Sequence, residues 1–291
     1  MIRSMTGYGA ATGRVGAQQV TVELRTVNHR FFNPSIKLAS SLARWEGEVR
    51  EAMRRGIARG HATLLARVER DARQAPVVNE ARVASYVALL RALQERHHLG
   101  GELDVATLLR MPDVLESDGV EEPATSGEDL VALVDEALAT LARMREAEGA
   151  RLATLLEERV ATLERTLERI AARAPERLVA ERERLRRGVR ELADGVDIDP
   201  ARLAQEIAVL ADRLDVAEEL DRFRAHIAAF RATLRDPKGK PVGKRLGFLL
   251  QEMLREANTT GSKARDADMT HDVVALKEEL ERIAEQVENV E

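Results

Sequence analysis

Apolar and polar residues alternate in the first part of the chain, as in Val20, Val22 and Leu24. Strict alternation is typical of a strand with one buried face. The pattern predicts strands over residues 2–11, 19–27, 35–38 and 61–68, and glycines in residues 13–16 join the first two as a hairpin. Residues 42–57 carry apolar side chains three or four apart, which predicts an amphipathic helix between the last two strands. These elements predict a small N-terminal α/β domain.

Beyond residue 79 the apolar spacing becomes helical. The predicted helices cover residues 83–93, 108–111, 130–170, a stretch after Pro175, 203–234 and 273–290. Gly- and acid-rich residues 119–127 are the best linker candidate, and residues 195–200 read as a turn. Such long stripes indicate packing against another helix, within this chain or from a second copy.

We therefore interpret the fold class as α+β, with a small N-terminal domain followed by a long-helix, mostly α region. The predicted domains are an N-terminal α+β domain with a helical extension at 1–120, a long-helix connecting region at 121–200, and a C-terminal helical domain at 201–291.

Composition excludes several classes of chemistry. The 291 residues include no cysteine, which excludes disulfides, thiolate catalysis and Cys-ligated zinc. No Walker A loop, GxGxxG unit, HExxH motif or nucleophile elbow occurs, so no nucleotide cofactor is expected. Because no apolar run approaches the length of a membrane span and no apolar leader segment is present, we expect a cytoplasmic protein without a membrane partner.

The net charge of −5 is unevenly distributed. Residues 1–73 contain thirteen Arg or Lys against six Asp or Glu, and residues 236–265 contain seven against three. Two basic regions in an otherwise acidic chain are compatible with two surfaces that meet one polyanion. Solvated charge in an arginine-rich chain explains the same numbers, and charge alone favours that interpretation.

A first group of candidate residues lies in residues 243–263. Glu252 and Glu256 are four apart on one helical face, where like charges repel by a few tenths of a kcal/mol unless a cation lies between them. Oxygen ligands of this kind suit Mg²⁺ or Mn²⁺. Arg255 and Asn258 line a neighbouring face, and residues 259–263 are predicted as a small polar turn whose Lys263 could approach a phosphate. The alternative is a solvated Glu/Arg face that ends in a glycine cap.

A second group lies in residues 210–227, taken as one helix. Asp215, Glu219, Arg222 and His226 then share one narrow face, and Asp221 lies just outside it. Two acids, an arginine and a histidine can hold a metal, orient water and contact a phosphate. The alternative, favoured by spacing alone, is a set of salt bridges four residues apart, with Glu218–Arg222 among them.

The third group is Asn28-His29-Arg30, at the end of a predicted strand. His29 is a candidate proton donor or base, and Arg30 a phosphate ligand. The following Phe31 and Phe32 are candidates for stacking on a base, although burial in the core is the more common role for such residues.

Several segments, in one order, resemble the YicC/YloC family of bacterial proteins. They are the opening MIRSMTGYG, the TVNHRF stretch from Thr26, RMREAEG from Arg143, DVAEELDRFRAH, LLQEMLREANTTGSKA and the closing EQVENVE. The resemblance implies a metal-dependent endoribonuclease with an N-terminal α/β domain, a helical C-terminal domain and a ring-like homo-oligomer, with a hexamer as the candidate size. It favours the functional interpretation of all three groups.

On that basis we expect hydrolysis of phosphodiester bonds within RNA, in RNA turnover, with Mg or Mn as cofactor. The catalytic candidates are His29, His226, Glu252 and Glu256. The metal candidates are Asp215, Glu219, Asp221, Glu252 and Glu256. The RNA-binding candidates are Arg3, Arg25, Asn28, Arg30, Arg222, Arg255, Asn258 and Lys263. The Asn28-His29-Arg30 turn is expected beside the two acid-rich helices.

The chain also departs from the family's usual sequence. The family usually has an acid where Gly247, Ala275 and Asn33 stand, and an asparagine where Leu254 stands. Loss of acids from a metal site would weaken cleavage. The alternative hypothesis is therefore a non-catalytic scaffold that binds RNA and delivers it to other nucleases, and a purely structural helical oligomer is the second.

Overall fold

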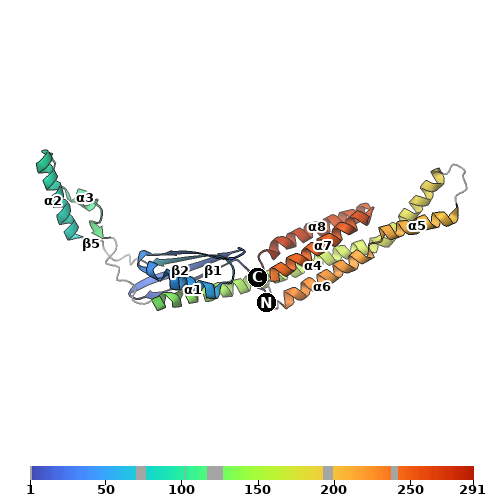
Figure 1. The fold of residues 1–291 in the computed structure, drawn as a ribbon, viewed down its shortest axis with the longest axis horizontal. Helices are drawn as coiled ribbons and strands as arrows, with labels where there is room; N and C mark the ends of the chain where they lie inside the picture. The colour runs from blue at the N-terminus through green and yellow to red at the C-terminus, as the bar shows by residue number, and fades with distance from the viewer. Residues whose placement is uncertain (1, 70–76, 102, 117–126, 193–198, 237–241) are drawn as a thin grey trace.

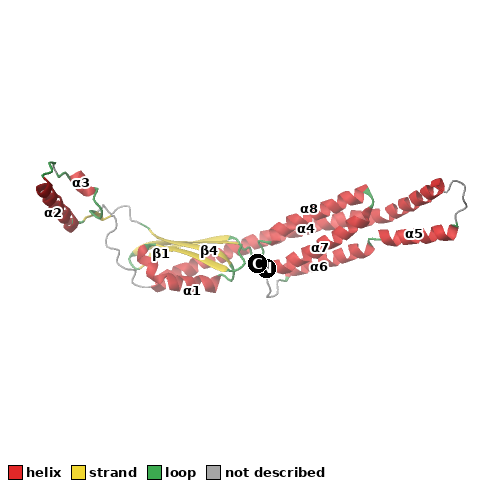
Figure 2. Ribbon diagram, turned by 45° about the horizontal axis from the view of Figure 1, so that its top comes forward, coloured by secondary structure: helices red, strands yellow, loops and turns green. Residues whose placement is uncertain are grey.

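A computed structural model describes residues 2–69, 77–101, 103–116, 127–192, 199–236 and 242–291. The molecule is elongated, and helix α4 (Gly127–Leu192) runs from an N-terminal sheet into a bundle of C-terminal helices (Figure 1). The α+β class is confirmed (Figure 2). None of the described helices is both long enough and apolar enough to cross a membrane.

The four predicted strands are present and form one sheet. They are β1 (Gly7–Val15), β2 (Gln18–Val27), β3 (Phe32–Leu38) and β4 (Gly60–Val68), in the order β1-β2-β4-β3. β1 and β2 form the predicted hairpin, although β1 begins later than expected and passes through Gly13. β2 and β4 are antiparallel, and β3 runs parallel to β4.

One face of this sheet is buried and the other is open. The alternating Val20, Val22 and Leu24 are fully buried under α1 (Glu46–Gly56) and α4, because period-two residues share a face. Both helices lie on the same side of the sheet in Figures 1 and 2. The single helix predicted over 42–57 is in fact a 3-10 helix, η1 (Ser40–Trp45), followed by α1.

A small module extends from the sheet. It contains α2 (Glu80–His97) and α3 (Val105–Leu109), with short strands β5 (Val77–Val78) and β6 (Leu115–Glu116) paired to each other. α2 confirms the predicted helix, yet none of its residues is buried. The predicted linker at 119–127 lies outside the described residues except for Gly127, where α4 begins.

Helix α4 corrects the prediction that a second helix starts after Pro175. It continues through Pro175 to Leu192. A proline removes one backbone donor and disfavours the helix interior, but packing can outweigh that cost. Here the Arg177 side chain, half a turn later, is buried and fixed to three backbone carbonyls of other helices, which holds this part of α4 in place.

Four helices complete the chain: α5 (Pro200–Leu214), α6 (Ala217–Arg235), α7 (Val242–Ala264) and α8 (Ala267–Val287). The prediction of one helix over 210–227 is wrong. Asp215 has extended backbone angles and ends α5, and α6 begins two residues later. The change of apolar face along residues 203–234 reflects this break. The predicted turn at 195–200 falls mostly on residues that the structure does not describe.

The polar turn predicted at 259–263 is also wrong, because α7 stays helical to Ala264. The hydroxyls of Thr259, Thr260 and Ser262 donate to backbone carbonyls of the same helix. Gly261 lies against α8: a Cβ there would be 3.1 Å from Val273 Cγ1. The glycine therefore permits close helix packing, and the chain turns only at Arg265 and Asp266, before α8.

The two ends of the chain meet beside α4 (Figure 1). Arg3 and Glu291 exchange backbone hydrogen bonds of 3.0 and 2.8 Å. The buried Arg145 of α4 donates to the Ser4 carbonyl at 2.6 Å and pairs with the Glu291 carboxylate. Several of the segments that resemble the YicC/YloC family therefore form this junction between the sheet and the helical bundle.

Candidate functional site

Helices α6 and α7 bring two sets of polar side chains together. Lys263, near the end of α7, contacts residues at the start of α6, so the two helices are antiparallel. Glu219, Arg222 and His226 lie three or four residues apart on α6, which places them on one face. Glu252, Glu256 and Lys263 share a face of α7 in the same way. We call these six residues the α6–α7 strip.

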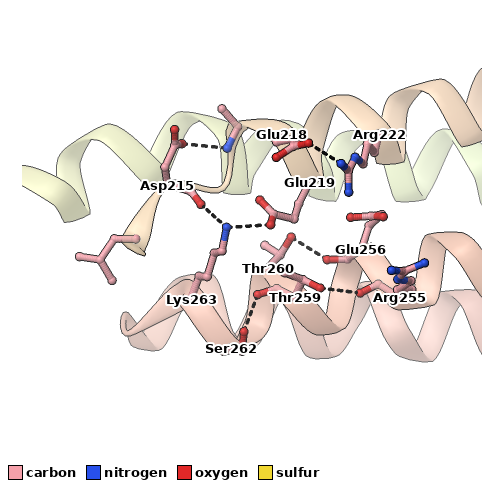
Figure 3. Close-up of polar contacts among 12 residues, drawn as sticks. Asp215, Glu218, Glu219, Arg222, Arg255, Glu256, Thr259, Thr260, Ser262 and Lys263 are labelled. Atoms are coloured by element: carbon pink, nitrogen blue, oxygen red, sulfur yellow. Dashed lines mark hydrogen bonds and ion pairs between the residues drawn. The ribbon is translucent and has the colours of Figure 1, made fainter. Parts of the chain in front are cut away.

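Glu219 is the most enclosed acid of the strip, at 7% exposed. Lys263 Nζ donates to Glu219 Oε1 at 2.7 Å and to the Asp215 carbonyl at 2.8 Å (Figure 3). The second carboxylate oxygen, Oε2, is buried and has no hydrogen-bond partner among the described residues. A buried charged oxygen without a partner is costly in free energy, so Glu219 retains capacity to bind a further donor or a cation.

Glu256 is a second buried acid, also close to the interface of the two helices. Figure 3 shows its carboxylate between α6 and α7, on the same side as Glu219. The Thr260 hydroxyl donates to the backbone carbonyl of Glu256, and no described side chain forms a hydrogen bond or ion pair with the Glu256 carboxylate. Glu252, one turn earlier, is partly exposed, and its carboxylate lies 3.8 Å from Arg255 Nη1. The sequence correctly placed these two acids on one face.

The remaining residues of the strip and its rim are more exposed. Arg222 pairs with Glu218, which confirms the salt bridge considered from spacing. His226 is half-buried and lies about 10 Å along α6 from Glu219, given the rise per residue of a helix. Arg255 and Asn258 are exposed beside the α7 face. The strip therefore has buried acids at its centre and cations at its edge.

Two of the predicted metal-binding acids lie elsewhere. Asp215 is not on α6, contrary to the single-helix prediction, and its carboxylate accepts a hydrogen bond from the Ala217 backbone N–H at 2.9 Å. Asp221 is exposed, and Arg224 Nη1 donates to it at 2.9 Å. Across the described ranges, no three His, Cys, Asp or Glu side chains form a metal-binding group. The structure thus brings Glu219 and Glu256 together, with Glu252 one turn away.

Arg177 supports the strip and was not identified from the sequence. Its Nη1 donates to the carbonyls of Lys263 and Ala264, both at 2.8 Å, and its Nη2 donates to the Leu214 carbonyl. It thus joins the ends of α5 and α7, where Lys263 reaches Glu219. Burial lowers the pKa of the Arg177 guanidinium from its ordinary value. Only its position two residues after Pro175 set it apart in the sequence.

The Asn28-His29-Arg30 turn does not lie beside the strip, which corrects our expectation. Asn28 Nδ2 donates to the Glu288 carbonyl at the end of α8, at 2.8 Å. Asn28 and Arg59 line a groove of about 700 Å³ with residues of α7 and α8, among them Gly247 and Leu254. His29 is exposed, and its Nδ1 lies 2.9 Å from the Phe31 carbonyl.

This groove and the strip lie on opposite faces of α7. Gly247 and Glu256 are nine residues apart, which is two and a half helical turns. The turn and the buried acids of one chain therefore cannot hold the same phosphate. The two departures at Gly247 and Leu254 line the groove, and Ala275 lies on α8, so none of these three residues belongs to the strip.

The predicted RNA-binding arginines of the N-terminal domain have different surroundings. Arg3 pairs with Glu146 of α4 at 2.6 Å, within the chain-end junction. Arg25 is exposed on the open sheet face, with its guanidinium 5.4 Å from the centre of the Tyr8 ring. Arg30 lies 5.2 Å from the centre of the Phe31 ring. Phe31 is 64% exposed, so the expectation that it is buried is wrong, whereas Phe32 packs against the core.

Comparison with known proteins gives a consistent assignment. The family model described as "Endoribonuclease YicC-like, N-terminal region" matches residues 2–154, and "Endoribonuclease YicC-like, C-terminal" matches residues 170–291. The chain is 32% identical over 299 residues to a protein of Clostridioides difficile named probable endoribonuclease YicC. It is 30% identical over 292 residues to a protein of the same name from Haemophilus influenzae. Both alignments cover all of this chain and all of the relative.

Proposed function

This chain belongs to the YicC-like endoribonuclease family, and we propose that it cleaves RNA at internal phosphodiester bonds, within the α6–α7 strip. The main evidence for cleavage at the strip is its pair of buried acids, Glu219 and Glu256. Glu219 keeps one buried oxygen without a donor, and the carboxylate of the buried Glu256 is bonded to no described side chain. A buried carboxylate oxygen without a partner, as in Glu219, is costly for stability and is typical of functional sites.

The acids of the strip fit a divalent cation of the magnesium type. Mg²⁺ in proteins is often held by one or two carboxylates, together with water and substrate phosphate. Glu219 Oε2 and the Glu256 carboxylate offer two such ligands, and Glu252 lies one turn away. When bound, Mg²⁺ or Mn²⁺ would activate a water molecule and offset charge on the phosphate.

The other residues of the strip have complementary roles in this proposal. Lys263 holds Glu219 in place through Oε1, which leaves Oε2 directed elsewhere. Arg222 and Arg255 bind phosphates of the strand by charge and position it without reading its sequence. The imidazole of His226 transfers a proton at a ring nitrogen, a role that histidine performs near neutral pH.

The non-catalytic scaffold remains the alternative. Its support was the set of departures from the family's usual sequence, three of which replace an acid. Gly247 and Leu254 line the groove on the opposite face of α7, Ala275 lies on α8 and Asn33 lies on β3. Because these positions do not contribute to the strip, they do not remove its acids. We therefore favour the catalytic proposal.

The first prediction is that Glu256→Gln and Glu219→Gln each abolish most cleavage. The substrate is a labelled circular RNA, which has no ends and so is opened only by internal cleavage. The amide keeps the shape of the side chain but removes the charge that a cation requires. We expect cleavage by the wild-type protein in Mg²⁺ or Mn²⁺, a loss of about a hundredfold or more in either variant, and none in excess EDTA.

Asp221→Asn is the matched control, because Asp221 is an exposed acid on the same helix, paired with Arg224 and outside the strip. It should cleave like the wild type. Circular RNA that is bound but stays uncut by the wild-type protein in either metal would support the scaffold instead. An equal loss of cleavage in Glu256→Gln, Glu219→Gln and Asp221→Asn would mean that cleavage does not depend specifically on the strip.

A further inference from the structure

The open face of the N-terminal sheet has no assigned role in cleavage. Its residues alternate with the buried ones, so neighbouring strands place them in rows. Tyr8, Arg25, Thr63 and Ser35 form one row across β1, β2, β4 and β3. Thr12, Thr21 and Arg67 form another. Figures 1 and 2 show α1 and α4 on the opposite side and no described helix over this face.

Positive charge gathers on this face. Its basic residues are Arg14, Arg25, Lys37 and Arg67, and its acidic residues are Glu23 and Glu69. Arg14, Lys37 and Arg67 form no ion pair with any residue that the structure describes, and Glu69 accepts a hydrogen bond from Thr21 at 2.6 Å. The positive local charge of residues 1–73 is thus partly collected on one surface, which favours a polyanion as its partner.

Two exposed aromatic rings are each paired with an arginine. Tyr8 on β1 is 39% exposed beneath the Arg25 guanidinium, and Phe31 immediately precedes β3 at the other edge of the sheet, next to Arg30. An exposed ring with an adjacent arginine is a common platform for a nucleobase, because both planar groups stack on it. Strands about 4.8 Å apart separate the two edges by roughly 14 Å.

We propose that this open sheet face binds single-stranded RNA, with Tyr8 stacking on a base and Arg25, Arg67 and Lys37 contacting phosphates. The inference rests on the proposed function, since it gives the strand that is cut a second binding surface on the N-terminal domain. Single-stranded RNA fits better than a duplex, because only unpaired bases expose their faces to an aromatic side chain.

The test measures binding separately from cleavage. Affinity for a fluorescent single-stranded RNA is measured by anisotropy in excess EDTA, for the full-length protein and its variants, at several salt concentrations. Tyr8→Ala should weaken binding on the order of tenfold, and Tyr8→Phe should stay within about twofold, because stacking needs the ring and not the hydroxyl. Arg67→Glu should weaken binding. It should also lower the number of ions released on binding, given by the slope of log affinity against log salt concentration, by about one to two.

Arg91→Glu on α2 is the matched charge reversal on an exposed arginine, away from the sheet in Figure 1. It should leave affinity for the single strand unchanged, and Tyr8→Ala should leave affinity for a duplex of the same sequence unchanged. Unaltered single-strand binding in both Tyr8→Ala and Arg67→Glu would overturn the proposal. So would a change of mass by light scattering in either variant, because a second copy of the chain would then cover this face. If RNA binds as expected but is never cut, the proposed cleavage is contradicted, whereas the proposed binding surface is still supported.

Discussion

At the scale of single residues, Lys263 has two separate roles. It neutralises the buried Glu219 through Oε1 and ties the end of α7 to the Asp215 carbonyl. Lys263 pairs with only one oxygen of the Glu219 carboxylate. The other oxygen can therefore still bind a second cation. The same contact explains why a lysine lies near the end of this helix: there it reaches across to the start of α6.

The second prediction is that Lys263→Met destabilises the fold by about 2 kcal/mol, because the buried Glu219 carboxylate loses its ion pair. The effect should be smaller than for a fully buried pair, since the Lys263 side chain is 29% exposed. Urea unfolding measures the change. The double variant Glu219→Gln/Lys263→Met should recover most of the loss, because it removes the uncompensated charge.

The same variant also tests for a cation. Added Mg²⁺ should restore stability to Lys263→Met by mass action, but not to the double variant. An unchanged unfolding midpoint in Lys263→Met would show that Glu219 does not depend on this ammonium group.

At the scale of secondary-structure elements, the start of α8 shows how one side chain fixes a helix. Asp266 is the N-cap: its Oδ1 accepts from the Met269 backbone N–H at 2.9 Å, and its Oδ2 lies 3.4 Å from Arg173 Nη2 on α4. Chiefly the hydrogen bond from Met269, and then Arg173, lower the pKa of the Asp266 carboxyl below its ordinary 3.8. The carboxylate form therefore stabilises the fold.

The third prediction is that Asp266→Ala costs about 1 kcal/mol at neutral pH, as for other lost caps. Asp266→Asn, which keeps an acceptor but loses the charge, should cost less. Because the pKa of Asp266 is lower in the folded state, its charge contributes fully above pH 3.8 and is lost as the pH falls through the folded value. Urea unfolding at a series of pH values should show the stability difference between the wild type and Asp266→Asn shrinking over that range. A difference that stays constant with pH would contradict this role of the charge.

Most elements were predictable because their signals are local. Alternation identified β1 and β2, the segments predicted as the other two strands lie within β3 and β4, and helical spacing identified α2 and the core faces of α7 and α8. The errors arose where tertiary contacts decide the outcome. Pro175 does not end α4, since the buried Arg177 fixes the helix beyond it. Gly261 does not end α7, and its missing side chain instead leaves room for the close approach of Val273 on α8. Neither contact is visible in the sequence.

At the scale of the whole molecule, the separation of the turn from the strip follows from the way the domains join. The spacing of residues within α7 placed Glu252 and Glu256 correctly on one face. No spacing in the sequence predicts which face of α7 lies next to Asn28. Asn28 and Arg59 approach the groove face of α7, opposite the buried acids. The ring-like oligomer stays a prediction. In such an oligomer a second copy would bring another Asn28-His29-Arg30 turn to the protein.

The chain-end junction should control how the two parts of the molecule unfold. Two apolar cores share α4: one lies under the sheet, and the other among α4, α6, α7 and α8. Between them, the N-terminal segment crosses α4 at Gly149. A Cβ there would be 2.2 Å from the Ile2 carbonyl oxygen and 2.8 Å from Arg3 Cα, both backbone atoms that cannot move without shifting the segment. Only glycine allows this crossing.

The last prediction therefore compares two Gly→Ala changes within helices. Gly149→Ala should destabilise the protein by about 2 kcal/mol, because overpacking against backbone outweighs the gain in helix propensity. Gly247→Ala should stabilise it by about 0.5–1 kcal/mol, since nothing lies within 4 Å of the added Cβ. We expect calorimetry to show one unfolding transition for the wild type and two for Gly149→Ala, as the sheet loses its coupling to the bundle. Equal effects of the two substitutions would mean that the crossing at Gly149 does not join the domains.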